Sequence, residues 1–170
     1  MARRHKVDLS LVCGVIAALS PINRWERNLV DADLLIKTVG NGDKITDLKV
    51  GTYNHNKEKA WLIALGNQPL EVLRGNKVRS FYGCLLFPNN SIDVCVDSHA
   101  INICLGRQAR ISATPTLTDE RYILLSNAYR CAAIAISEDS LETTVTPMQV
   151  QGVTWTLYRV LRGIDKAFQI

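Results

Sequence analysis

Apolar residues recur at helical spacing along most of this chain, whereas alternation with a period of two is almost absent. A spacing of three or four residues places apolar side chains on one face of a helix, where other helices can bury them. Proline, glycine and capping residues divide the pattern. The expected helices span 9–19, 24–37, a segment capped by Asn54, 69–73, 77–87, 97–106, a segment capped by Thr118, and a last segment that starts at Thr146. The sequence therefore predicts an all-α fold of about seven helices.

Three of these segments indicate which face is buried. The last one has the strongest start, because Thr146 and Gln149 form a capping box with Pro147 at the first helical position. We expect Gln149 and Gln151 to belong to this capped surface helix. The apolar faces expected in the core are Val78, Phe81, Tyr82 and Leu85, then Tyr122, Leu125, Tyr129, Ala132 and Ile136, and finally Val150, Val153, Leu157, Leu161 and Ile164.

The length of 170 residues fits one domain, 1–170, and we expect a monomer. A net charge of +4 excludes heavily basic proteins such as histones. The charge is uneven, because residues 1–85 carry 13 Lys and Arg against 8 Asp and Glu (+5), and residues 86–170 carry 7 against 8 (−1). A basic half is typical of a surface that faces phosphates, and solvated helix faces are the ordinary alternative.

The five cysteines are interpreted as small buried apolar residues in a reducing compartment, because most of them lie inside apolar runs, as Cys13 and Cys95 do. None has zinc-site spacing, so we expect neither a metal nor another cofactor. The basic run 3–6 is interpreted as a solubilising tail. It precedes an apolar stretch, and this order is also found in secretory signal peptides. Asp8 interrupts that pattern, and the helical spacing of 9–19 favours a core helix. The longest apolar run is well short of the length needed to cross a bilayer, so we expect no transmembrane helix. With the reducing compartment that the cysteines indicate, we expect a cytoplasmic protein.

Four motifs follow one another in a fixed order. Ala18-Leu19-Ser20-Pro21-Ile22 comes first and Gly51-Thr52-Tyr53-Asn54-His55-Asn56-Lys57 second, followed by Leu73-Arg74-Gly75-Asn76-Lys77 and Val96-Asp97-Ser98-His99. The third motif predicts two helices joined by a very tight turn. Together the motifs resemble the helix-hairpin-helix DNA glycosylases related to endonuclease III, over residues 9–110. The chain has no carboxy-terminal cysteine cluster, so it resembles members without an iron–sulfur cluster.

The resemblance implies an enzyme that removes a modified or damaged base from duplex DNA after flipping the nucleotide out of the stack. Asp97 is then the catalytic carboxylate that stabilises positive charge on the sugar or activates water. Lys77, if neutral, can attack the same carbon and add strand cleavage. The implied DNA-binding residues are Arg74, Gly75, Asn76 and Arg79 in the hairpin, and Ser20, Pro21, Ile22 and Asn23 in the loop that fills the vacated gap. The base-pocket candidates are Trp25, Tyr53, Asn54 and His99.

Ordinary structural roles stand beside each of these assignments. Asp97 can be a helix N-cap, Lys77 a solvated surface lysine, and His99 a hydrogen-bonding residue at a helix start. Trp25, Tyr53 and Trp155 can be packing residues. The hairpin has one glycine and is shorter than the family's, and Ile22 stands where the family often has glutamine.

These departures favour a second hypothesis, a non-catalytic DNA-binding accessory protein with the glycosylase fold. A third is an enzyme that modifies a base without excising it. The carboxy-terminal segment 146–155 looks similar to small phage-encoded proteins of unknown function, which would place the protein in the host cytoplasm.

Overall fold

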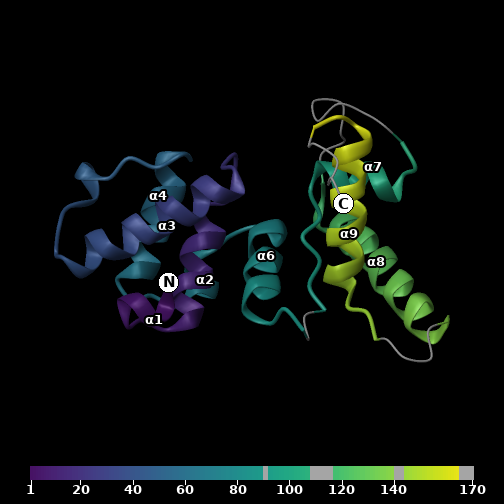
Figure 1. The fold of residues 1–170 in the computed structure, drawn as a ribbon, viewed down its shortest axis with the longest axis horizontal. Coiled ribbons are helices and arrows are strands. Elements are labelled where there is room, and N and C mark those ends of the chain that lie inside the picture. The colour runs from purple at the N-terminus through teal and green to yellow at the C-terminus, as the bar shows by residue number, and fades with distance from the viewer. Residues whose placement is uncertain (90–91, 108–116, 140–143, 165–170) are drawn as a thin grey trace, which may run out of the picture. The chain divides into compact units, whose positions relative to one another are not determined.

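The computed structural model describes residues 1–89, 92–107, 117–139 and 144–164. Within these ranges the regular structure is helical, which confirms the predicted all-α class (Figure 1). The elements are α1 (Ala2–His5), α2 (Leu9–Leu19), α3 (Trp25–Gly40), the 3-10 helix η1 (Ile45–Asp47), α4 (Asn54–Ala64), α5 (Pro69–Val72), α6 (Asn76–Leu86), α7 (Ser98–Cys104), α8 (Asp119–Asp139) and α9 (Pro147–Leu161).

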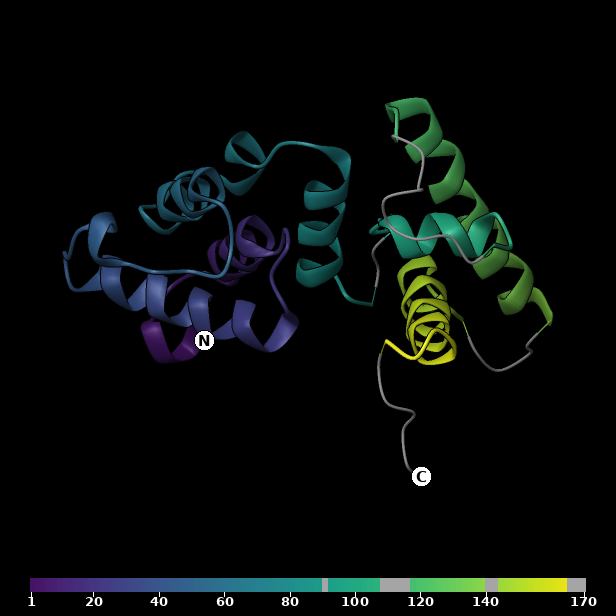
Figure 2. The same ribbon diagram turned by 90° about the horizontal axis from the view of Figure 1, so that it is seen from above.

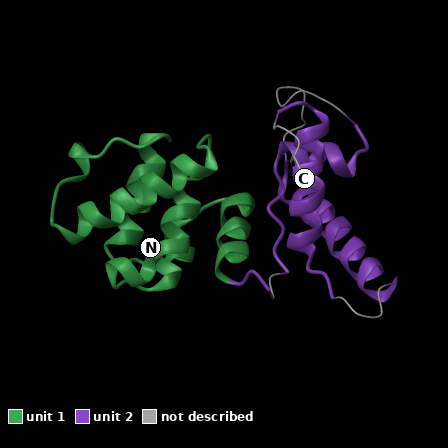
Figure 3. Cartoon of the chain, in the orientation of Figure 1, with its two compact units in different colours: residues 1–86 green, residues 87–170 purple. Residues whose placement is uncertain are grey.

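The chain forms two compact units, unit 1 (Met1–Leu86) and unit 2 (Phe87–Ile170), which are coloured separately in Figure 3. The boundary lies where the charge changes sign: unit 1 carries 13 Lys and Arg against 8 Asp and Glu, and unit 2 carries 7 against 8. The basic half of the sequence is therefore one structural unit. The change in charge was interpreted as a property of the surface and not as a boundary between units, and the assignment of 1–170 to one domain stays a prediction.

Unit 1 is built around α2, which contacts α3, α4, α5 and α6 (Figures 1 and 2). Val15, Ala17 and Leu19 of α2 have no exposed surface. Gly14 allows α5 to come close, because a Cβ atom at this position would lie 2.8 Å from Cγ of Pro69. α6 adds the predicted apolar face, with Tyr82 buried and Val78, Phe81 and Leu85 packed against the same core.

The basic residues 3–6 were expected to be a solubilising tail, and the structure differs. Residues Ala2–His5 form α1, which lies against α3. Asp33 of α3 accepts a hydrogen bond from Nη2 of Arg4 at 2.6 Å, and Nε2 of His5 lies 2.7 Å from the same carboxylate oxygen. The run is therefore part of the fold of unit 1, because Asp33 supplies a partner 29 residues from Arg4.

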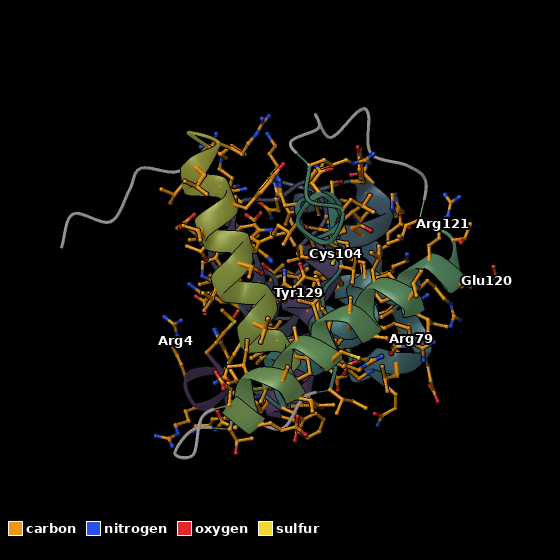
Figure 4. The ribbon with its side chains drawn as sticks, turned by 90° about the vertical axis from the view of Figure 1, so that its right-hand side faces the viewer. Arg4, Arg79, Cys104, Glu120, Arg121 and Tyr129 are labelled. Atoms are coloured by element: carbon orange, nitrogen blue, oxygen red, sulfur yellow. The ribbon has the colours of Figure 1, made fainter. Side chains whose placement is uncertain are left out.

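Unit 2 consists of α7, α8 and α9, and each of these helices contacts the other two. Its core is small: Val94, Val96, Ala100, Ile101, Tyr122, Tyr129, Ala133 and Val150. Tyr122 of α8 holds the chain before α7, because its hydroxyl donates to the carbonyl of Val94 at 2.7 Å and accepts from the N–H of Val96 at 3.3 Å. Burial raises the pKa of the Cys104 thiol on α7 and of the Tyr129 hydroxyl on α8, two side chains that are labelled in Figure 4.

The predicted orientation of α9 is wrong. Its capping box is present, with Thr146 and Gln149 bonded to each other's backbone N–H as predicted. However, only Val150 of the expected apolar face is buried; Val153, Leu157, Leu161 and Ile164 are exposed. The reason is that α9 turns Trp155 and Tyr158 towards α7 instead.

Two smaller expectations are also wrong. Ile136 of α8 is exposed, although the helical spacing placed it with the buried Tyr122 and Tyr129. Cys131 of the same helix is exposed as well, whereas Cys13 and Cys84 are buried as expected. Both exceptions lie in unit 2, where the small core leaves much of α8 in solvent.

Candidate nucleic-acid interface and carboxylate site

The loop that follows α2 begins where Pro21 removes a backbone donor. In a continuing helix the N–H of residue 21 would bond to the carbonyl of Ala17, and proline has no N–H. The N–H and hydroxyl of Ser20 bond to that carbonyl instead, at 3.3 and 2.9 Å. The carbonyl of Ile16 accepts from Nδ2 of Asn28, which is buried in α3, at 3.0 Å. The chain therefore leaves α2 with these carbonyls satisfied and enters residues 20–24, which we name the clamped loop.

Asp31 of α3 connects the clamped loop to residues 50–53, which we name the facing loop. Its side chain is completely buried. The carboxylate accepts hydrogen bonds from Nδ2 of Asn23 at 3.0 Å, from Nε of Arg27 at 2.7 Å and from the N–H of Gly51 at 2.7 Å. A buried carboxylate requires such partners, because an unpaired charge removed from water is strongly destabilising. The carboxylate of Asp31 thus binds both loops and one arginine.

Thr52 provides a second connection between the loops. Its hydroxyl donates to the carbonyl of Pro21 at 2.8 Å and accepts from Nδ2 of the buried Asn56 at 3.0 Å. Gly51 allows this close approach, because a Cβ atom at this position would lie 2.8 Å from Oδ1 of Asn23. The motifs that begin at Ala18 and Gly51 in the sequence are therefore side by side in unit 1.

Ile22, at the tip of the clamped loop, has a left-handed backbone with φ of 56°. A β-branched residue with positive φ is a rare and strained case. The side chain is nevertheless 69% exposed, so burial of apolar surface does not compensate for the strain. Strain of this kind persists only where the surrounding contacts enforce it, and it is concentrated at functional sites.

Exposed aromatic side chains lie next to these loops. Tyr53 is exposed and stacks on His55, with ring centroids 5.6 Å apart and planes at 11°. Trp25 is also exposed and meets Phe81 edge-on at 6.4 Å. Asn54 is exposed as well, but its expected capping role is wrong, because Tyr53 is the N-cap of α4 and no side-chain cap is formed. Three of the four base-pocket candidates thus lie on the surface of unit 1.

The hairpin lies between α5 and α6 and has the tight turn that the sequence predicts. Leu73 is buried, Arg74 is exposed, and Gly75 has a left-handed backbone with φ of 78°. Nη2 of Arg79, labelled in Figure 4, donates to the carbonyl of Leu70 at 3.3 Å. Asn76 is the first residue of α6 and is half-buried. The turn therefore has two arginines close to its backbone.

The two residues that the resemblance assigns to catalysis lie in different units, Lys77 in unit 1 and Asp97 in unit 2. Lys77 is exposed in the first turn of α6. A neutral lysine nucleophile generally requires burial or a neighbouring positive charge. Lys77 is exposed, so it does not meet the first of these two requirements.

Asp97 is the N-cap of α7. Its Oδ1 accepts from the backbone N–H groups of His99 and Ala100 at 3.0 and 2.9 Å, and its Oδ2 accepts from Nε1 of Trp155 at 2.9 Å. Asp97 therefore has the N-cap role that was the structural alternative to catalysis. Both oxygens are fixed, because one holds the start of α7 and the other holds α9.

The surroundings of Asp97 come from α7 and α9. The His99 ring is buried and lies 5.9 Å from the Trp155 ring and 5.6 Å from the Tyr158 ring, measured between centroids. The guanidinium of Arg159 lies 4.4 Å from the centroid of Trp155, a distance at which the ring attracts a cation. A carboxylate held in this way can stabilise positive charge at a fixed point.

Trp155 was expected to be a packing residue, and neither Tyr158 nor Arg159 was among the expected site residues. A signal was present, because positions 155, 158 and 159 have the i, i+3, i+4 spacing of one helix face. Aromatic and basic residues on that face, opposite the exposed apolar stripe, mark the side of α9 that meets α7.

Within the described residues, no group of three or more His, Cys, Asp and Glu side chains is placed to hold a metal ion. The helices described in the structure include none with the length and apolar character needed to span a bilayer.

The chain matches a known protein family over most of its length. Residues 1–162 match the model of DUF7178, a family of unknown function. The searches of curated proteins and of solved structures found no match to the chain. Because the match extends over most of the 170 residues, the chain belongs to the DUF7178 family.

Proposed function

We propose that this protein binds DNA through unit 1, with the clamped loop, the facing loop and the hairpin as the interface. Three properties of unit 1 support the proposal: a net charge of +5, exposed aromatic rings beside the loops, and a glycine turn with two arginines. Positive charge attracts the phosphate backbone, and aromatic rings can stack on bases. Backbone N–H groups at a tight turn can bind a phosphate without reading sequence.

The observation that carries the proposal is the conformation of Ile22. An apolar side chain held in solvent by a strained backbone is unfavourable for the free protein. Apolar residues in such positions act as wedges between base steps in many proteins that distort DNA. The hydrogen bonds of Asn23 and Thr52 hold the loop on both sides of Ile22, so its shape exists before any partner binds.

The binding can be tested by fluorescence anisotropy with a labelled duplex at several salt concentrations. We expect Arg74→Ala and Arg79→Ala each to weaken binding and to lower the salt slope by about 1 for each phosphate that the variant no longer neutralises. Lys37→Ala, in the last turn of α3, removes the same charge from a helix that is not part of the hairpin and serves as the control. No binding at low salt, or equal affinity for all variants, would contradict the proposal.

A second candidate function is base removal of the glycosylase type, with Asp97 at the reacting sugar. The observation that favours it is the partly buried carboxylate whose two oxygens have a fixed orientation. In this function His99 would lie beside the base. The strand cleavage that the resemblance assigns to Lys77 is a separate proposal, because Lys77 belongs to unit 1.

Duplexes that contain uracil, oxidised, alkylated or phage-type modified bases test this second function by mass spectrometry. Release of one base that is abolished in Asp97→Asn would support it, and no release from any substrate would leave DNA binding as the function. A mass change without release would indicate base modification. Borohydride trapping tests Lys77 separately, since an adduct that survives Lys77→Ala excludes this lysine as the nucleophile.

A further inference from the structure

We infer that Asp31 is the positioning residue of the DNA-binding loop: its buried carboxylate keeps Ile22 strained and exposed. This inference rests on the proposed function of unit 1 for its meaning, but its structural part stands on contacts within unit 1 alone. Asp31 lies on α3, the helix that directly follows the clamped loop, nine residues after Ile22. It is not expected to touch DNA, because it has no exposed surface.

The donors to Asp31 come from both loops. Asn23 directly follows Ile22, and its Nδ2 donates to Oδ2 of Asp31. The N–H of Gly51 donates to the same oxygen from a position 20 residues further along the chain. A single carboxylate oxygen therefore fixes the distance between the clamped loop and the facing loop.

The residue on the other side of Ile22 is held as well. The carbonyl of Pro21 accepts from the hydroxyl of Thr52, which directly follows Gly51. Ile22 thus lies between two residues that are each bonded to a neighbouring element. Proline restricts its own φ, so the chain has little freedom left to relax on that side. Because the residues on both sides are held in place, Ile22 adopts the left-handed backbone that connects them.

Burial of the Ile22 side chain is not the cause of the strain, because most of the side chain is in solvent. Glycine or asparagine would adopt the same backbone more readily. The hydrogen bonds to the Asp31 carboxylate offset the strain in the backbone of Ile22, and replacing the carboxylate removes these hydrogen bonds.

A stability cycle on the full chain tests the structural part. Ile22→Asn should raise the folding equilibrium constant of unit 1 about fivefold, because asparagine tolerates a left-handed backbone. In the Asp31→Asn background the loop is released, and the same substitution should give no gain. Asp33→Asn, on the same helix, is the matched control and should preserve the gain. Urea unfolding followed by hydrogen exchange of α2 and α3 peptides reads out unit 1 specifically.

Two results would overturn the inference: an equal gain in the Asp31→Asn background, or no gain in the wild-type background. If Asp31→Asn does not fold, Asn23→Ala takes its place, since it breaks the contact to the clamped loop and leaves Arg27 and Gly51 bonded to Asp31.

DNA affinity separates this inference from the proposed function. We expect Ile22→Asn and Asp31→Asn to weaken duplex binding by a similar factor, about fivefold to tenfold, and the double variant to show no further loss. Unchanged affinity in Ile22→Asn would reject the loop as a DNA interface, while the stability cycle would still decide the role of Asp31. Weaker binding in Ile22→Asn with wild-type binding in Asp31→Asn would reject the positioning role alone.

Discussion

Trp155→Phe tests the hydrogen bond that connects α9 to the start of α7. The substitution keeps an aromatic ring beside His99 and Arg159 and removes the Nε1–H that donates to Oδ2 of Asp97 at 2.9 Å. A hydrogen bond to a charged group contributes roughly 1.5–3 kcal/mol. Asp97 is only partly buried, so water replaces part of this contribution, and about 1 kcal/mol remains. The smaller ring reduces apolar packing by an amount on the order of 0.5–1 kcal/mol.

We therefore expect Trp155→Phe to destabilise unit 2 by about 1.5–2 kcal/mol. Urea unfolding of the full chain, followed by hydrogen exchange of α7 and α8 peptides, measures this change in the free energy of unfolding. Because ring size and hydrogen bond change together, the cycle needs a second background, Asp97→Ser. Serine can still cap α7 but is too short to reach Trp155.

In the Asp97→Ser background, Trp155→Phe should be less destabilising by about 1 kcal/mol, which is the coupling between the two side chains. Coupling below about 0.3 kcal/mol would refute the reasoning, because the hydrogen bond would then contribute nothing to the attachment of α9 to α7.

Two further predictions concern packing and pH. Gly14→Ala should destabilise unit 1 by about 1–2 kcal/mol in urea unfolding, because its Cβ would lie 2.8 Å from Cγ of Pro69, whereas Gly152→Ala has open space and should stabilise α9 by roughly 0.5–1 kcal/mol. Burial raises the pKa of Tyr129 above its ordinary value of about 10, so its contribution to the stability of unit 2 is complete below pH 10 and falls as the pH rises further. Tyr129→Phe should reduce this alkaline loss of stability in unfolding measurements from pH 8 to 12, and a loss as large as that of the wild type would contradict the role of Tyr129.

Local signals predicted much of the secondary structure. The spacing of apolar residues and the Ser20-Pro21 stop placed α2 at its observed bounds. The capping box of Thr146 and Gln149 placed the start of α9. These features depend on residues within one or two helical turns of one another, so a single sequence contains the information.

The contacts that form the candidate sites could not be predicted in the same way. Asp31 meets Gly51 across 20 residues, and Asp97 meets Trp155 across 58. The residues around each aspartate in the sequence do not indicate which distant residue it contacts. The core-facing side of α9 was also assigned wrongly, because the sequence shows an apolar stripe but not that Trp155 and Tyr158, on the other side, contact His99 of α7 instead. Tertiary packing decides such cases.

Hydrogen exchange of the full chain with and without a duplex at low salt tests the proposed interface most directly. We predict slower exchange in peptides that contain residues 20–24, 50–53 and 73–79. Peptides from α8, which belongs to unit 2, should show no change. High salt should remove the protection. Protection confined to unit 2, or none in the clamped loop at a DNA concentration that saturates binding, would contradict the central claim that unit 1 holds the DNA.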